Sequence, residues 1–153
     1  MMKNTVVLLF FGLILYSQTA FGQNINYIRA NYEKATTDKT VCQSLIKDLG
    51  NEKISNLELA YLGALETIWA KYVGNPFSKL STFNKGKEKL EKAVKNAPDN
   101  LEIRYLRLSV QKNAPSILGY DKAIKTDVEF LRKNIGRVEL AALRNRIEQL
   151  LKG

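Results

Sequence analysis

Residues 55–76 read SNLELAYLGALETIWAKYVGNP, and this stretch decides the fold class of the chain. Ser55 is followed three residues later by Glu58, which is the spacing of a capping box at the start of a helix. Apolar residues then recur every three or four positions, from Leu57 to Tyr72, as one face of an α-helix requires. Gly74 marks the end of this helix, and we expect a turn at 75–77 because proline cannot continue a helix.

The same helical period governs the chain on both sides of this stretch. Thr37 or Asp38 is placed to cap a preceding helix, and Asp99 with Glu102 repeats the capping pattern further on. We expect helices at about 25–32, 38–49, 55–73, 78–96, 99–113, 121–134 and 138–151. Because the turns between them are short, the sequence predicts an all-α array of antiparallel helical hairpins.

The N-terminus has the layout of a secretory signal peptide. Lys3 precedes the apolar run Val6–Leu15, and the small residues of Ala20-Phe21-Gly22 suit cleavage before Gln23. A membrane anchor is the alternative, but a spanning helix needs about 20 apolar residues and this run is half as long. We therefore expect a signal peptide at 1–22, a single domain at 23–153 without a transmembrane segment, and export to the periplasm or the extracellular medium.

The chain is basic and contains one cysteine. Its 24 Lys and Arg against 15 Asp and Glu give a net charge of +9 over 153 residues. Because Cys42 is the only cysteine, an intramolecular disulfide is excluded and stability must come from packing. Cys42 lies in a predicted helix, where we expect a small buried residue; a redox or intermolecular thiol is the alternative.

One helix carries a repeat signature. Gly86, Leu90, Ala93 and Pro98 are separated by four, three and five residues, which resembles the second helix of a tetratricopeptide repeat. Leu62-Gly63 resembles the Leu-Gly pair of the first helix of that repeat. In this pattern the small residues permit close approach of neighbouring helices, and the large residue fills the space between them. The resemblance, over Leu57–Lys112, implies a tetratricopeptide-like right-handed array of about seven helices.

The sequence departs from the repeat at two points. Gly63 and Gly86 are 23 residues apart, where the repeat expects about 12. The first helix must therefore be longer or the turn near 75–79 enlarged. Arg104 also stands where an aromatic residue is favoured, and an irregular helical bundle is the alternative fold.

Three further stretches resemble small exported helical proteins of Gram-negative bacteria. These are Asn75–Phe77, Leu101–Arg107 and Pro115–Tyr120. That group has no established function, so the resemblance supports the fold alone.

The residue inventory argues against an enzyme. The chain has no histidine, and with a single cysteine the usual zinc, haem and Cys-His or Ser-His-Asp sites cannot be assembled. Two carboxylate pairs remain. We interpret Glu58, which shares a face with Glu66, as a capping residue, and Asp127 with Glu129 as part of a solvated helix face. We therefore expect no catalytic residues, no cofactor and no metal.

The predicted helix 78–96 carries a cluster of lysines: Lys79, Lys85, Lys87, Lys89, Lys92 and Lys95. A solubilising face is one interpretation, with Glu88–Lys92 and Glu91–Lys95 as intrahelical pairs. The other is a binding face, centred on Lys85, Lys89 and Lys92, for an acidic partner. Export argues against nucleic acid and favours acidic proteins, anionic glycans or phospholipid headgroups.

A second candidate surface involves Trp69, Arg104 and Arg107. Trp69 lies at the edge of an apolar stripe, and we expect most neighbouring aromatic residues (Tyr72, Phe77 and Phe83) to be in the core. Aromatic and Arg side chains are common interface anchors, so these three residues are predicted to line a concave groove. Peripheral packing of Trp69 is the alternative.

These expectations favour an exported, non-enzymatic helical-repeat module that binds a protein or peptide partner through a groove and a positive face. The alternative is a structural or surface-associated protein attached by its basic face to an anionic component of the envelope. The sequence leaves the oligomeric state open.

Overall fold

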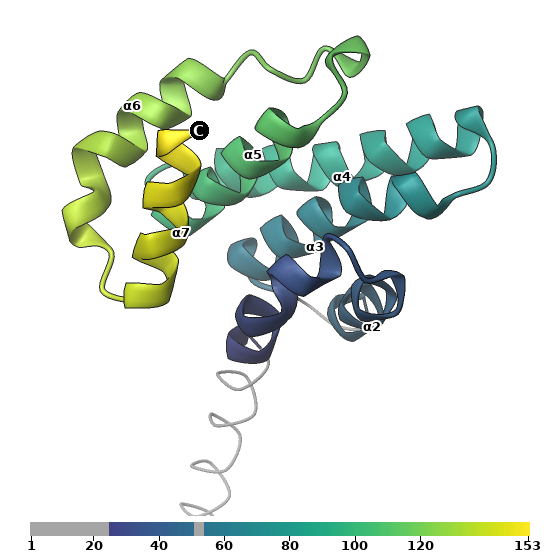
Figure 1. Ribbon diagram of the computed structural model, residues 1–153, viewed down its shortest axis with the longest axis horizontal. Helices are drawn as coiled ribbons and strands as arrows, with labels where there is room; N and C mark the ends of the chain where they lie inside the picture. Colours follow the sequence, from purple (N-terminus) through teal and green to yellow (C-terminus); the bar gives the residue numbers. More distant parts are fainter. Residues whose placement is uncertain (1–24, 51–53) are drawn as a thin grey trace, which may run out of the picture.

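The computed structural model describes residues 25–50 and 54–153, and every regular element in them is helical (Figure 1). Residues 25–35 form a first helical segment. It is followed by α2 (Lys39–Leu49), α3 (Asn56–Trp69), α4 (Pro76–Asn96), α5 (Leu101–Asn113), α6 (Ile124–Asn134) and α7 (Ala141–Lys152). Three single 3₁₀ turns lie between them: η1 (Ala70–Tyr72), η2 (Ser116–Leu118) and η3 (Ile135–Arg137). The all-α prediction is confirmed. The predicted signal peptide lies outside the described residues.

Side-chain caps fix the starts of α2, α3 and α4. The capping box at Ser55 is confirmed, because the Ser55 hydroxyl accepts from the Glu58 N–H and the Glu58 carboxylate accepts from the Ser55 N–H. Asp38 caps α2. Asn75 caps α4, so Pro76 is the first residue of that helix rather than part of a turn. Proline is suited to this position, where the missing N–H would have no partner within the helix.

The predicted cap of α5 was wrong. Asn100, not Asp99, accepts a hydrogen bond from the Ile103 N–H at 3.0 Å. Glu102 is instead 6% exposed and contacts residues outside α5. Asn and Asp cap helices about equally well, so the sequence alone does not decide between Asp99 and Asn100.

The helices α3 and α4 pack so closely that only glycine fits where their backbones meet. A Cβ atom on Gly63 would lie 2.6 Å from the Gly86 carbonyl oxygen, and one on Gly86 would lie 2.5 Å from the Gly63 carbonyl oxygen. Gly63 also faces Leu90, whereas Gly86 faces Thr67, so the two helices run antiparallel. Gly63 and Gly86 are far apart in sequence for two reasons. The 3₁₀ turn η1 lengthens the end of α3, and α4 already begins at Pro76, ten residues before Gly86.

The remaining helices pack around this hairpin. The helix α2 contacts α3 on one side, while α5 contacts both α3 and α4 and is covered in turn by α6 and α7 (Figure 1). The C-terminal helix also reaches residues 25–35, because Arg146 of α7 pairs with Glu33 at 2.9 Å. Cys42 is fully buried beneath α3, which confirms the prediction of a buried residue. In the described parts of the chain, no helix is long and apolar enough to cross a membrane.

Candidate functional site

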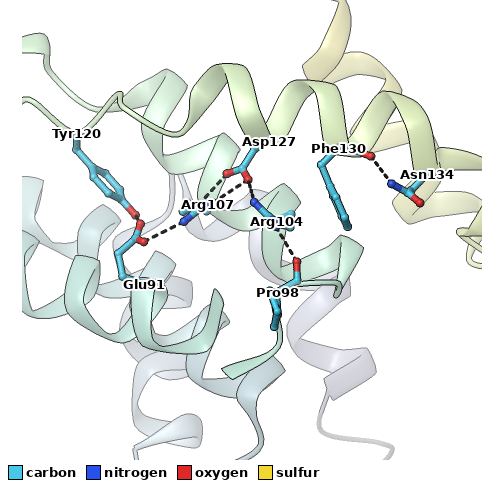
Figure 2. A network of polar contacts seen from close by, with 8 residues as sticks. All are labelled: Glu91, Pro98, Arg104, Arg107, Tyr120, Asp127, Phe130 and Asn134. Atoms are coloured by element: carbon cyan, nitrogen blue, oxygen red, sulfur yellow. Dashed lines mark hydrogen bonds and ion pairs between the residues drawn. The ribbon is translucent and has the colours of Figure 1, made fainter. Parts of the chain in front are cut away.

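Two of the predicted site residues, Arg104 and Arg107, converge on a buried carboxylate (Figure 2). Asp127 of α6 is 0% exposed. It accepts from Arg107 Nε and Nη2 at 2.7 and 2.8 Å, and from Arg104 Nη1 at 2.7 Å. Burial lowers the pKa of Arg107, but the hydrogen bonds and the charge of Asp127 outweigh it and raise that pKa above its usual value. Both guanidinium groups are therefore engaged in joining α5 to α6.

This network extends to α4 and to the loop before α6 (Figure 2). Glu91 of α4 accepts from Arg107 Nη1 at 2.9 Å and from the Tyr120 hydroxyl at 2.5 Å. The ring of Tyr120 also meets that of Phe83 edge to face, with centroids 6.0 Å apart. The network thus ties three helices together and fastens the loop that carries η2 to α4.

The structure corrects the interpretation of two carboxylates. Asp127 was expected on a solvated face, but its position three residues after Ile124 and four before Leu131 puts it on the buried stripe of α6. Glu91 was expected to pair with Lys95 within its own helix and instead binds Arg107 and Tyr120. An acid on an apolar stripe was the sequence signal for the buried ion pair.

The other predicted site residues lie apart from this network. Trp69 is partly buried, with its ring 5.5 Å from that of Tyr72 and the Lys39 ammonium group 5.6 Å from its centre. Lys89 binds Glu66 of α3 with contacts of 2.9 and 2.7 Å, which leaves Lys85 and Lys92 as exposed cations of the α4 face. The structure therefore does not bring Trp69, Arg104 and Arg107 together in one set of contacts. Phe77, expected in the core, is 86% exposed.

A second buried network, missed by the sequence analysis, joins residues 25–35 to α3 and α5. Glu102 binds Arg29 through two hydrogen bonds of 2.8 and 2.7 Å, and it accepts a third from the Tyr61 hydroxyl at 2.6 Å. The Tyr61 ring in turn meets that of Tyr32 edge to face, at 5.4 Å between centroids. The hydrogen bonds that Arg29 donates to Glu102 raise the pKa of Arg29. These contacts fix the position of Tyr32.

Tyr32 forms part of the floor of a pocket of about 440 Å³, which we call the inner pocket. Its walls come from the C-terminal ends of residues 25–35, α3 and α5, and α4 contributes Phe83. The lining residues are Tyr32, Thr36, Thr67, Ile68, Lys71, Phe83, Ser109, Val110, Asn113 and Ala114. The inner pocket is the concave site that most nearly corresponds to the predicted groove, although its lining residues differ from those predicted.

The inner pocket has an apolar floor and a polar rim. Phe83 and Val110 are buried in the floor beside Tyr32, and burial raises the pKa of the Tyr32 phenol above its usual value. Thr36, Lys71 and Asn113 are exposed at the rim. The rim therefore offers hydroxyl, amide and ammonium groups around an apolar base.

A second pocket of about 370 Å³ adjoins the first and shares Lys71 and Phe83 with it. We call it the apolar pocket. The lining residues are Ala70, Lys71, Pro76, Lys79, Leu80, Phe83, Pro115, Ile117 and Leu118. Among the described residues its lining contains no carboxylate and no neutral hydrogen-bonding side chain.

Neither pocket contains a group of metal-binding side chains. Within residues 25–50 and 54–153, no cluster of three or more His, Cys, Asp or Glu side chains is placed to hold a metal ion. Comparison of the chain with protein-family models, curated proteins and solved structures found no match. The function is therefore inferred from the residues and contacts of this chain.

Proposed function

We propose that this chain is an exported, non-enzymatic, tetratricopeptide-like helical module that binds a peptide segment of a protein partner in the inner pocket. The observation that carries the proposal is the composition of that pocket, which combines a buried aromatic and aliphatic floor with a rim of hydrogen-bonding groups. Ligand sites are typically concave and apolar, with a few polar groups that set orientation. The close packing of Gly63 on Gly86 supports the tetratricopeptide-like part of the proposal.

The chemistry of the rim suits a polypeptide. A bound backbone presents N–H and C=O groups that lose water on binding, and each needs a partner. The Asn113 amide donates one N–H to the Ser109 carbonyl and keeps its oxygen and second N–H for a ligand. The Thr36 hydroxyl donates to the Glu33 carbonyl and can still accept. An apolar side chain of the peptide would then fill the space above Phe83 and Val110.

The charge of the rim favours an acidic segment. Lys71 is exposed and lies on the boundary between the two pockets. Its ammonium group donates to the Thr36 carbonyl, which holds it over the rim. A carboxylate on the peptide would form a charge-assisted contact there.

The pocket is held by contacts that do not depend on a ligand. Tyr32 is positioned by the Arg29–Glu102–Tyr61 network, and Thr67 donates its hydroxyl hydrogen to the Ala64 carbonyl at 2.7 Å. A site that exists before binding loses little conformational entropy when the ligand arrives. The proposed mechanism is therefore capture of a flexible segment by a rigid helical surface.

The test begins with a random 12-residue peptide library displayed on phage and selected against the protein as the cell exports it. Selected sequences are synthesised, and their Kd is measured by fluorescence anisotropy against the parent protein and three variants. Asn113→Trp places a large ring on the rim of the inner pocket. Asn84→Trp makes the same change at an exposed position of the outer face of α4 and serves as the matched control.

We expect the Asn113→Trp variant to weaken binding by about tenfold or more, which corresponds to about 1.4 kcal/mol, while Asn84→Trp leaves Kd unchanged. Thr36→Trp, also at the rim, is expected to act like Asn113→Trp. Selected peptides that bind all three variants as tightly as the parent would overturn the proposed site. A library that yields no binding sequence would count against peptide binding itself.

A further inference from the structure

Large apolar side chains project into solvent at one end of the α3–α4 hairpin. Ile117 of η2 is 92% exposed, Phe77 in the first turn of α4 is 86% exposed, and Leu80 one turn later is 47% exposed. Leu80 and Ile117 line the apolar pocket together. We call Phe77, Leu80 and Ile117 the apolar tip. Phe77 lies outside the apolar pocket and lines a neighbouring shallow pocket together with Leu80. Scattered apolar residues are common on protein surfaces, but three large ones linked through Leu80 mark an interaction surface.

The two segments that form the tip are held in place from within the protein. The loop that carries Ile117 is fastened at Tyr120, whose hydroxyl binds Glu91 and whose ring packs on Phe83. Gly119, with φ of 57°, lets the chain turn between η2 and this anchor, because the left-handed conformation is easily adopted only by glycine. The exposure of Ile117 is therefore fixed by the surrounding structure.

The surroundings of the tip are cationic. Lys71 and Lys79 line the apolar pocket and are exposed, and none of its described lining residues is acidic. Beside Phe77 and Leu80, the exposed Lys85 balances the exposed Glu88. A second copy of this chain would bring lysines against lysines in a symmetric contact, which like-charge repulsion disfavours. The partner of this surface is therefore anionic as well as apolar.

The tip differs from the inner pocket in its hydrogen-bonding chemistry. The apolar pocket beside the tip is lined by Pro76 and Pro115, which have no backbone N–H. Among the described residues, the only polar side chains of that lining are Lys71 and Lys79. A peptide backbone placed there would lose its hydrogen bonds to water without replacement. Acyl chains need no such partners, and a fluid bilayer can surround a projecting side chain on every side.

We propose that the apolar tip inserts into the headgroup and upper acyl region of an anionic phospholipid bilayer, with Lys79 on the phosphate groups. Interfacial proteins combine buried apolar side chains with basic residues in this way, and the binding depends on both. This surface is separate from the proposed peptide contact at Asn113 and Thr36, so the module would bind a partner while attached to a membrane.

The test measures co-sedimentation of the exported protein with two kinds of vesicle. One contains phosphatidylcholine alone, and the other contains about 30% phosphatidylglycerol as the anionic lipid. All variants carry the same N-terminus as the parent. Leu80→Ser alters the tip, and Leu140→Ser alters a residue with the same exposed fraction, 47%, at the start of α7. A double variant, Phe77→Ser with Ile117→Ser, removes the two most exposed side chains, and Lys79→Gln removes one charge.

We expect binding to the anionic vesicles and much weaker binding to phosphatidylcholine. The double variant should reduce the partition coefficient about tenfold or more, and Lys79→Gln should reduce it about fivefold. Leu80→Ser should weaken binding, whereas Leu140→Ser should leave it unchanged. Circular dichroism checks that each variant is folded.

The proposal is overturned if the protein does not bind anionic vesicles, or if Leu140→Ser and Leu80→Ser weaken binding equally. It is also overturned if the double variant changes the oligomeric state or abolishes binding of the selected peptides while vesicle binding is retained. The peptide assay with Asn113→Trp is independent of these changes, so failure of the tip and failure of the inner pocket are distinguishable.

Discussion

Asp127 and Arg107 form a two-point ion pair in the interior of the protein, with the carboxylate completely buried between α5 and α6. Arg104 completes the arrangement from the same helix. Taking a carboxylate out of water is costly unless its oxygens are fully hydrogen-bonded, and here three N–H groups satisfy them. This pair positions α6 on α5 and, through Glu91, holds the η2 loop.

The first prediction concerns this carboxylate. Asp127→Asn keeps the size of the side chain but removes the buried charge that Arg107 and Arg104 share, leaving Arg107 with Glu91 alone, and it points an amide N–H toward guanidinium donors. We expect the free energy of unfolding, measured by urea denaturation, to fall by about 3–5 kcal/mol. Glu129→Gln on the exposed face of the same helix should change it by less than about 0.5 kcal/mol. Equal effects at the two positions would show that the buried pair has no special role.

The second prediction concerns the close approach of α3 and α4. Gly86→Ala would place a methyl group 2.5 Å from the Gly63 carbonyl oxygen and 2.7 Å from the Thr67 backbone nitrogen. Because the obstacles are backbone atoms, the helices must move apart, and we expect a loss of about 1–3 kcal/mol in the free energy of unfolding. Gly136→Ala is the control, since an added Cβ there meets nothing within 4 Å. A Gly86→Ala variant as stable as the parent protein would contradict the packing described for the hairpin.

The third prediction tests the network beneath the inner pocket. Tyr61→Phe removes the hydroxyl that donates to Glu102 at 2.6 Å, leaving one oxygen of a buried carboxylate with one partner fewer. We expect the free energy of unfolding to fall by about 1–2 kcal/mol. Tyr27→Phe, at a residue that is 52% exposed, should have little effect. The hydroxyl would have no structural role if the two variants unfolded at the same urea concentration.

The fourth prediction is a loss of stability in alkali. Burial raises the pKa of Tyr105 to about 12 from 10.0 and that of Cys42 to about 11 from 9.0, and it raises the pKa of Tyr32, Tyr61 and Tyr120 as well. The unfolded chain therefore loses these protons at lower pH than the native protein does. The contribution of these protonated groups to the free energy of unfolding is fully present below about pH 9 and is lost as the pH rises toward 12.

The measurement for this prediction is the urea midpoint at pH 8, 10 and 11. It should fall at each step, and Tyr105→Phe should reduce the fall because that variant has one buried phenol fewer. Each such group contributes at most about 1.4 kcal/mol per pH unit. A midpoint that stays constant from pH 8 to 11 would contradict the burial of these groups.

Much of the fold was predictable because helix signals are local. The Ser55–Glu58 capping box, the cap at Thr37 or Asp38 (the structure has Asp38) and the burial of Cys42 depend on residues close in sequence, and all are confirmed. The apolar period likewise placed the helices to within a few residues. The start of α4 was missed because Pro76 is compatible with both a turn and a first helical position, and only the Asn75 cap decides between them.

The polar networks were not predictable from the same signals. Glu102 and Glu91 each have a plausible role within their own helix, but both bind partners at least 16 residues away in sequence. Their true contacts depend on how the helices are packed, which local patterns do not specify. The inner pocket was missed for the same reason, because its lining is assembled from four helical units.

The most direct test of the central claim, that a peptide binds in the inner pocket, is a ¹H–¹⁵N correlation spectrum of the protein titrated with a selected peptide. The proposed function predicts that the largest shifts occur at Thr36, Thr67, Ser109 and Asn113, with little change on the outer face of α4. Shifts concentrated at Lys85 and Lys92 on that face, with the inner pocket unaffected, would contradict it and favour binding through the basic surface.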